Sequence, residues 1–368
     1  MSKQIQEAYI VAATRLPVAK RNGMYRNVRP DDMLAAVIKA VVAQVPGIDP
    51  ARIGDVIIGC AMPEAEQGMN VARIGLLLAG LPITVPGITI NRFCSSGVQA
   101  VADAANQIRL GLADVMIAGG TESMSVMPQM MGNKMSMNPA IFAKEENLGI
   151  AYGMGLTAEK VANQWEISRE AQDAFAVASH QKACAAIAAG HFKAEISPYA
   201  IREYLPDLKT GQVRIRERTV DTDEGPRPDS SVERLGKLRP VFHARGSVTA
   251  GNSSQMSDGA AAAVVMSADK AEELGLAPIA RFVSYATAGC LPEHDAPEPV
   301  RHSKQIVLVQ LLVGEGPSGL EGVRDHGSEL HPPDLCLLRL GVDYTPVGGG
   351  EIAAGGLEAA NLLILPGG

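Results

Sequence analysis

"ITINRFCSSGVQAVADAANQIRLGLADVMIAGG", residues 88–120, contains the pattern that decides the fold. Its apolar start leads into a turn that carries Cys94, and its end, "DVMIAGG" (114–120), has the continuous apolar character of a buried strand. Between them, apolar residues recur at helical spacing, at Val98, Val101, Ala105, Ile108 and Leu112. The stretch therefore predicts a strand, a helix and a second strand, which is the repeating unit of a parallel sheet.

The same alternation continues on both sides of this unit. Short Val-, Ile- and Ala-rich runs predict strands at 8–14, 55–60, 259–267 and 280–289. "RPDDMLAAVIKAVVAQV" (29–45) and "NVARIGLLLAG" (70–80) predict helices. We therefore expect an α/β fold in which helices cover both faces of a parallel sheet.

Composition narrows the function classes. Hydrophobic residues make up 46% of the 368 residues and aromatic residues only 4%, so the core must consist of Ala, Val, Ile, Leu and Met. The net charge of −7 argues against nucleic-acid binding driven by overall charge. Pro82 and Pro86 interrupt the most apolar stretch, so no membrane span is expected. The N-terminal residues show no secretory signal.

The cysteines point to a reducing compartment. The chain has five, with no CxxC pair: Cys60, Cys94, Cys184, Cys290 and Cys336. Such scattered cysteines favour neither a disulfide framework nor a zinc site. We therefore expect a cytoplasmic protein without a metal.

Residues 121–245 interrupt the alternation. They begin with a Met-rich stretch, contain a helix pattern at 167–190 and end in a charged, turn-rich segment at 200–245. In the helix pattern, Ser168 is a good N-cap and Gly190 follows the last turn. We expect a long insertion with helices of its own, after which residues 259–267 return to the sheet.

Cys94 has two interpretations. A lone cysteine beside an apolar strand is most often a small buried residue. At a strand-to-helix junction, however, it lies near the free N–H groups and positive dipole of the helix start, which favour the nucleophilic thiolate. Ser95 and Ser96 can cap that helix, and Gly97 leaves room for a ligand. The local pattern leaves both interpretations open.

"GSVTAGNSSQMSDGAAAAVV", residues 246–265, is a second candidate. Its small and hydroxyl residues precede a strand, and clusters of this kind usually only form turns. From the residues alone we favour a tight loop over a ligand-binding loop.

Together these stretches resemble the thiolase family. The resemblance covers about residues 7–289 and rests on "IVAATRLPV" (10–18), "NRFCSSGVQA" (91–100), "AGGTESMS" (118–125), "MGLTAEKVA" (154–162), "ISREAQDAFAVASHQKA" (167–183), "KLRPVF" (237–242) and "GSVTAGNSSQMSDGAAA" (246–262). "GCAMPEAEQGMNVAR" (59–73) is most similar to the degradative 3-ketoacyl-CoA thiolases, or acetyl-CoA C-acyltransferases, of fatty-acid β-oxidation.

The resemblance implies a fold. Thiolases have two βαβαβαββ halves in a five-layer α-β-α-β-α arrangement, with a loop domain inserted in the first half. The expected N-terminal half comprises 1–120 and 246–272, with the loop domain at 121–245. The C-terminal half would be 273–368, family-like only to about 289 and atypical or incomplete beyond it.

The resemblance also implies chemistry. Cys94 corresponds to the nucleophile, which takes the acyl group from a 3-ketoacyl-CoA before CoA, the co-substrate, removes it. No other cofactor is implied. Ser254 corresponds to a contact of the pantetheine arm, Arg227 to a contact of the adenine end of CoA, and Met154 to the acyl pocket. Ala250 and Gly251 correspond to the loop beside the pantetheine tunnel. A homodimer or homotetramer is expected, with a hydratase/dehydrogenase subunit as a further partner.

Residues 290–368 depart from the family pattern. The family's second half supplies Asn-Glu-Ala-Phe, Gly-His-Pro and Cys-x-Gly segments, and none of them occurs there. His331 lies in "ELHPPD" and Cys336 in "DLCLLRL", without the required neighbours. A shifted reading frame or a rearranged gene end would explain this, and we expect impaired turnover. Two alternatives to an active thiolase are a catalytically dead remnant that binds CoA or a partner subunit, and a ketoacyl-synthase-like condensing enzyme.

Overall fold

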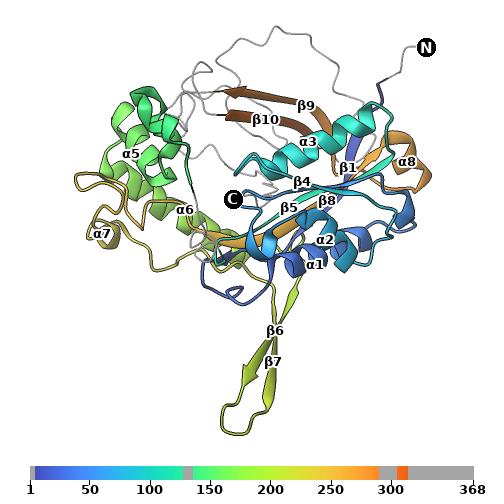
Figure 1. Cartoon of the computed structure of the whole chain (residues 1–368), viewed down its shortest axis with the longest axis horizontal. Coiled ribbons are helices and arrows are strands. Elements are labelled where there is room, and N and C mark those ends of the chain that lie inside the picture. Colours follow the sequence, from blue (N-terminus) through green and yellow to red (C-terminus); the bar gives the residue numbers. More distant parts are fainter. Residues whose placement is uncertain (1–4, 127–135, 290–304, 314–368) are drawn as a thin grey trace.

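The computed structural model describes residues 5–126, 136–289 and 305–313 (Figure 1). Within them an eight-stranded sheet has the order β10-β9-β1-β8-β5-β3-β4, and β2 pairs with β8. Its strands are β1 (Ala8–Arg15), β2 (Ala19–Lys20), β3 (Val56–Gly59), β4 (Gly87–Ile90), β5 (Val115–Ser123), β8 (Ser257–Ser267), β9 (Ala280–Gly289) and β10 (Gln305–Val313). The strands predicted at 8–14, 55–60, 114–120, 259–267 and 280–289 are thus confirmed.

The expectation of a parallel sheet is wrong, because the sheet is mixed. β3 runs parallel to β4 and to β5, whereas β8 is antiparallel to both β5 and β1. β9 and β10 extend the β1 side with further antiparallel pairs. The cause lies in the connection to β8. The chain leaves the sheet at the end of β5 and returns at the same edge, where Ser123 pairs with Asp258, so β8 must run in the opposite direction.

Helices cover both faces of the sheet, as expected. On one face α1 (Pro30–Ala43) and α2 (Val71–Leu78) pack with Val56, Ile58 and Val264 in one buried cluster. On the other, α3 (Ser96–Arg109) packs with Ile57 and Val265 in a second. The alternation of Val56, Ile57 and Ile58 between two clusters is the period of two of a strand buried on both faces.

The segment between β5 and β8 contains helices of its own, as the sequence indicates. They include α5 (Met154–Gln164), α6 (Arg169–Ala189) and the short α7 (Val232–Leu235), and α8 (Ala268–Glu273) follows β8. Ser168 caps α6 by accepting a hydrogen bond from the Ala171 N–H, and Gly190 ends α6 in the left-handed region (φ 76°), so both predicted helix signals are confirmed. None of the helices in the described ranges is both long and apolar enough to span a membrane.

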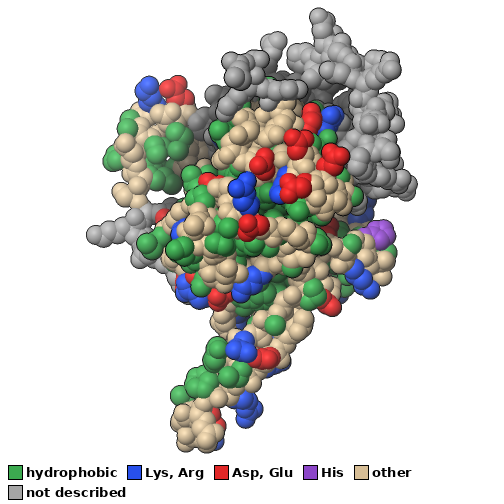
Figure 2. Space-filling view, turned by 90° about the vertical axis from the view of Figure 1, so that its right-hand side faces the viewer, with side chains coloured by type: hydrophobic (Ala, Val, Ile, Leu, Met, Phe, Trp, Pro, Cys, Tyr) green, Lys and Arg blue, Asp and Glu red, His purple; other side chains and the backbone are tan. Residues whose placement is uncertain are grey.

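The charged segment at 200–245 contains a hairpin that the sequence analysis did not predict. β6 (Tyr199–Pro206) pairs with β7 (Val213–Val220) in a separate two-stranded sheet. The hairpin projects from the body in Figure 1 and again in the side view of Figure 2. Most of its residues are exposed, so no buried apolar stripe marks it as a strand pair in the sequence.

Candidate active site

The residues of interest gather at one edge of the sheet. The carboxyl ends of the parallel strands β3 and β4 lead to Cys60 and Cys94, and the carboxyl end of β5 leads into the inserted segment. Because β8 is antiparallel to β5, the loop that precedes it lies at this same edge. The structure therefore brings the nucleophile candidate and the 246–256 loop to the side where ligands bind in parallel α/β sheets.

Cys94 is exposed, so the interpretation as a buried core residue is wrong. Cys94 directly precedes Ser95, the N-cap of α3, and so belongs to the amino end of that helix, where the helix dipole is positive. Ser96 closes the turn, because its hydroxyl donates to the Phe93 carbonyl at 2.5 Å and accepts from the Arg92 N–H at 2.8 Å. The Ser95 side chain makes no capping bond, contrary to expectation.

Close packing against β3 fixes the start of α3. A Cβ on Gly59 would lie 2.5 Å from the Ser96 carbonyl carbon and 2.6 Å from the Gly97 nitrogen. Only glycine at the end of β3 therefore allows the helix to begin so near the strand. The segment that carries Cys94 is therefore positioned by direct backbone contact between α3 and β3, and not by a long side chain.

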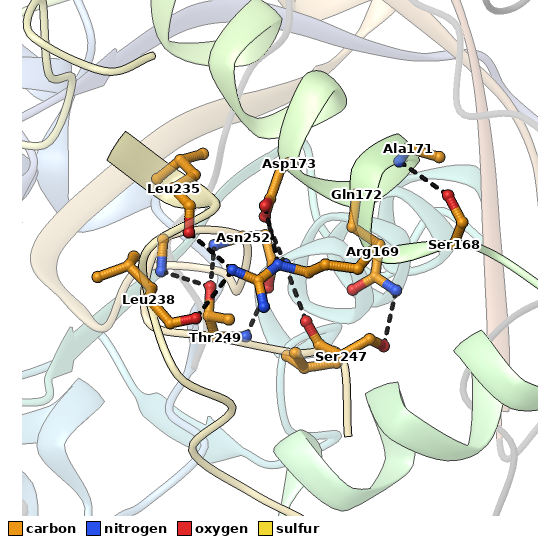
Figure 3. A network of polar contacts seen from close by, with 12 residues as sticks. Ser168, Arg169, Ala171, Gln172, Asp173, Leu235, Leu238, Ser247, Thr249 and Asn252 are labelled. Atoms are coloured by element: carbon orange, nitrogen blue, oxygen red, sulfur yellow. Dashed lines mark hydrogen bonds and ion pairs between the residues drawn. The ribbon is translucent and has the colours of Figure 1, made fainter. Parts of the chain in front are cut away.

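Figure 3 shows a polar network that holds the 246–256 loop. Asp173 on α6 is 2% exposed, and its carboxylate accepts from Arg169 at 2.8 Å and from the Asn252 side-chain amide at 2.9 Å. Asn252 in turn donates to the Ser247 carbonyl and accepts from the Thr249 N–H. A buried carboxylate thus ties both ends of the loop to α6.

Two side chains, Arg169 and Glu159, complete this attachment with two hydrogen bonds each. Arg169 donates to the carbonyl oxygens of Leu235 and Leu238, which joins the α7 segment to α6 (Figure 3). Glu159 on α5 is 5% exposed and accepts from the N–H groups of Ser247 and Val248, each at 2.9 Å. Three elements of the inserted segment therefore position the loop that precedes β8.

The residues that the resemblance assigns to CoA lie on these elements. Ser254 and Ala250 are exposed in the loop, and Gly251 is half-buried, where an added Cβ would lie 2.4 Å from the end of the Leu235 side chain and would make it shift. Met154 begins α5 and is 54% exposed. Exposed Arg227 pairs with Asp229 at 3.4 Å, and its backbone N–H donates to the His180 ring. A bond from the Gln255 amide to the Gly225 carbonyl links the Arg227 segment to the loop.

The sequence analysis did not identify three residues whose side chains hold the loop before β8 or its attachment. Arg169 and Asp173 lie in a stretch that was interpreted as a helix and a family motif, and Glu159 lies in a stretch that was quoted only as a family motif. Each carries a polar side chain that the structure buries or half-buries. The signal was present, since a charged residue on the apolar side of a helix must find a partner. The partner itself could not be identified, because Asn252 is 79 positions from Asp173.

Comparisons with known proteins identify the family of the chain. The family described as thiolase, N-terminal domain, matches residues 8–269. The chain belongs to the thiolase family. Its α/β fold is thiolase-like, and a solved acetyl-CoA acetyltransferase of Bacillus anthracis superposes with a TM-score of 0.68 at 38% identity, over 79% of this chain and 73% of that one. The expected five-layer arrangement needs the second half, most of which lies outside the described residues.

Curated thiolases are similar over most of the chain. A 3-ketoacyl-CoA thiolase of Bacillus subtilis (strain 168) is 49% identical over 292 residues, 78% of this chain and 73% of the relative. One of Cronobacter sakazakii is 39% identical over 356 residues, 95% of this chain and 88% of the relative. A peroxisomal 3-ketoacyl-CoA thiolase of Arabidopsis thaliana is 36% identical, over 95% of this chain and 77% of the relative.

Proposed function

We propose that this enzyme cleaves a 3-ketoacyl-CoA with CoA, giving acetyl-CoA and an acyl-CoA shortened by two carbons, as in fatty-acid β-oxidation. The observation that carries the proposal is the exposed Cys94 thiol at the amino end of α3, at the ligand-binding edge of the sheet. Similar proteins named 3-ketoacyl-CoA thiolase support the substrate class.

The reaction proceeds in two steps through Cys94. The thiolate attacks the 3-keto carbon, the C2–C3 bond breaks, and the C2 carbanion takes a proton to leave as acetyl-CoA. The thiol of a second CoA then attacks the acyl-enzyme carbonyl, its proton is removed, and Cys94 leaves as thiolate. The α3 amino end stabilises the thiolate at the start and the end of this cycle.

The inserted segment and the loop before β8 would bind the CoA moiety. We assign Ser254, Ala250 and Gly251 to the pantetheine arm, Arg227 to the adenine end and Met154 to the acyl pocket. The network around Asp173 supports this assignment, because it holds the loop in one conformation before a ligand arrives. This assignment makes 121–245 the loop domain and 1–120 with 246–272 the N-terminal half.

Mass spectrometry tests the proposal directly. The protein is mixed with 3-ketohexanoyl-CoA without free CoA, and a butanoyl mass increase is sought on the peptide that contains Cys94. Cys94→Ala is the negative control, and Cys184→Ala, which removes another thiol from α6, is the matched control that should keep the adduct. An adduct on another residue, or none with protein that still binds CoA, contradicts the proposal.

A catalytically dead CoA-binding protein is the second candidate. It is favoured by the absence of the family's second-half segments from residues 290–368. Without these segments the catalytic rate would fall severely, since removal of one oxyanion donor typically lowers the rate by about 10²–10³. Release of acetyl-CoA over many cycles identifies an active thiolase, whereas CoA binding without release identifies the dead form.

We further propose that the chain forms a homodimer through β4. In the part of the chain that the structure describes, β4 is the last strand of the sheet, and its outer side has no partner strand. Ile88 on this strand is 47% exposed, and neighbouring Leu78 on α2 is 49% exposed. An apolar strand edge of this kind favours pairing with a second copy. Ile88→Lys should shift the sedimentation coefficient to that of a monomer.

Larger assemblies and the cellular location are further predictions. A homotetramer and a hydratase/dehydrogenase partner would show as larger species on size exclusion, alone or with that subunit added. A cytoplasmic location is a further prediction, and Cys60, Cys94 and Cys184 form no disulfide in the part of the chain that the structure describes.

A further inference from the structure

Residues 91–96 form the turn that carries Cys94, called the Cys94 turn below. A buried carboxylate, which the proposed reaction does not use, is connected to this turn through hydrogen bonds. Glu122, near the end of β5, is 2% exposed. One of its oxygens accepts from the Ala61 N–H at 2.6 Å, and the other accepts from the Gln67 side-chain amide at 2.5 Å. Burial is the main reason that the pKa of Glu122 is raised, and these bonds act in the opposite direction. A fully buried acid with both oxygens engaged is costly and calls for a reason.

Gln67 is the second residue that attaches the 60–67 loop to β5. It is 0% exposed, and besides Glu122 its amide nitrogen donates to the Met62 carbonyl at 2.9 Å. Its amide oxygen accepts from the Ser123 N–H at 2.9 Å. Glu122 and Gln67 together therefore fix both ends of the 60–67 loop against β5.

The same loop also makes hydrogen bonds to the Cys94 turn. The Ala61 carbonyl accepts from the Asn91 side chain at 2.9 Å, and the other end of that amide accepts from the Phe93 N–H at 2.8 Å. Phe93 directly precedes Cys94 and has a left-handed backbone (φ 46°). One residue, Ala61, thus connects the buried carboxylate on its N–H side with the Cys94 turn on its carbonyl side.

We propose that Glu122 is a positioning residue for Cys94. Its carboxylate fixes the 60–67 loop, the loop fixes Asn91, and Asn91 fixes the left-handed turn that places the thiol at the amino end of α3. This inference rests on the proposed role of Cys94 as the nucleophile. The effect of a helix terminus falls off within one turn, so a small displacement of the turn changes how strongly the thiolate is stabilised.

The first variant is Glu122→Gln. Its amide nitrogen cannot accept a hydrogen bond, so either the Ala61 N–H or the Gln67 amide loses its acceptor inside the core. We expect the rate of Cys94 alkylation by iodoacetamide at pH 7 to fall about 3- to 10-fold, with the midpoint of its pH profile moved upward. An unchanged profile in folded protein overturns the inference.

Exchanging the two groups provides a rescue. In Glu122→Gln with Gln67→Glu, the new amide can donate to the new carboxylate and still accept from the Ala61 N–H, while the Ser123 N–H keeps its acceptor. The bond to the Met62 carbonyl is lost, so we expect partial recovery of the Cys94 profile. Recovery of thermal stability without any recovery of the profile contradicts a positioning role.

Asp258→Asn is the matched control. Asp258 is also a buried carboxylate at this edge, 0% exposed, and its pKa is also raised mainly by burial. It accepts from the Ser125 N–H at 2.8 Å and from the Ser123 hydroxyl at 3.1 Å, and neither residue belongs to the Cys94 turn. We expect a lower melting temperature and an unchanged Cys94 profile. If Asp258→Asn shifts the profile as far as Glu122→Gln does, the effect is general destabilisation and the inference fails.

Asn91→Ala keeps the inference testable if Glu122→Gln does not fold. Asn91 is exposed, so its removal leaves the core intact while it breaks the same connection at its outer end. We expect the same upward shift of the Cys94 profile, and its absence overturns the inference. The wild-type profile separates the two proposals. A Cys94 midpoint at the value of an ordinary thiol counts against the nucleophile itself, whereas a low midpoint that neither variant changes counts only against Glu122.

Discussion

Cys60 and Cys94 follow the ends of two neighbouring parallel strands, yet their surroundings are opposite. Cys60 comes directly after β3, is 0% exposed and has its pKa raised to about 12, chiefly by burial and further by Glu122. Cys94 comes four residues after β4, is exposed and lies at the start of a helix. The pair shows that the sheet edge alone does not activate a thiol. We propose that solvent access and a helix terminus decide which of the two cysteines reacts.

The largest expected effect is a contrast in alkylation. With a pKa near 12, Cys60 is thiolate to only about 1 part in 10⁴–10⁵ at pH 7.5, whereas a thiol with the ordinary pKa of 9.0 is thiolate to about one part in thirty. Iodoacetamide should therefore modify Cys94 at least about 10³-fold faster than Cys60, as measured by peptide mass spectrometry. In urea the two rates should converge. Alkylation rates of Cys94 and Cys60 within tenfold of each other in the folded protein would contradict the prediction.

The next effect concerns Gly59, which lies between the two cysteines. Gly59→Ala places a methyl group 2.5 Å from the Ser96 carbonyl carbon, so α3 must move away from β3. We expect a loss of about 3 kcal/mol in the free energy of unfolding and slower alkylation of Cys94. Gly153→Ala is the matched control, since a Cβ there meets nothing within 4 Å. Equal stability of the two variants in urea titrations would contradict the prediction.

The sequence predicted the local part of this contrast and missed the distant part. The strand, turn and helix around Cys94 follow from spacing within 33 residues, and the caps of α6 follow from Ser168 and Gly190. The antiparallel direction of β8 does not, because it depends on where the chain returns after the insertion. The contacts of Ala61 with Glu122 and with Asn91 also join segments that are 61 and 30 positions apart. Local periodicity cannot identify such partners.

Alkaline stability tests the buried side of the comparison. The thiol of Cys60 ionises near pH 9.0 when it is unperturbed and near 12 in the fold, so only the unfolded chain gains from ionisation between these values. Its contribution to stability is complete below about pH 9 and is lost as the pH rises toward 12, by about 2 kcal/mol at pH 10.5. Cys60→Ala should therefore lose less stability than the wild type between pH 8 and 10.5 in urea titrations. Tyr199, whose pKa is raised to about 12 by burial, is present in both proteins and cancels. Parallel losses in the two proteins would show that Cys60 is not protected from ionisation.

The smallest effect concerns backbone strain beside Cys94. Phe93 has a φ of 46° and a side chain that is 68% exposed, so its bulk costs backbone energy without much burial in return. Phe93→Gly should raise the free energy of unfolding by about 0.5 kcal/mol, because the strain relieved slightly exceeds the added chain entropy. The freer turn should also slow Cys94 alkylation and leave Cys60 unreactive. Glu166→Gly, at a φ of 51° after α5, is the matched control and should change stability alone. If both variants slow Cys94 equally, the left-handed turn has no specific role in presenting the thiol.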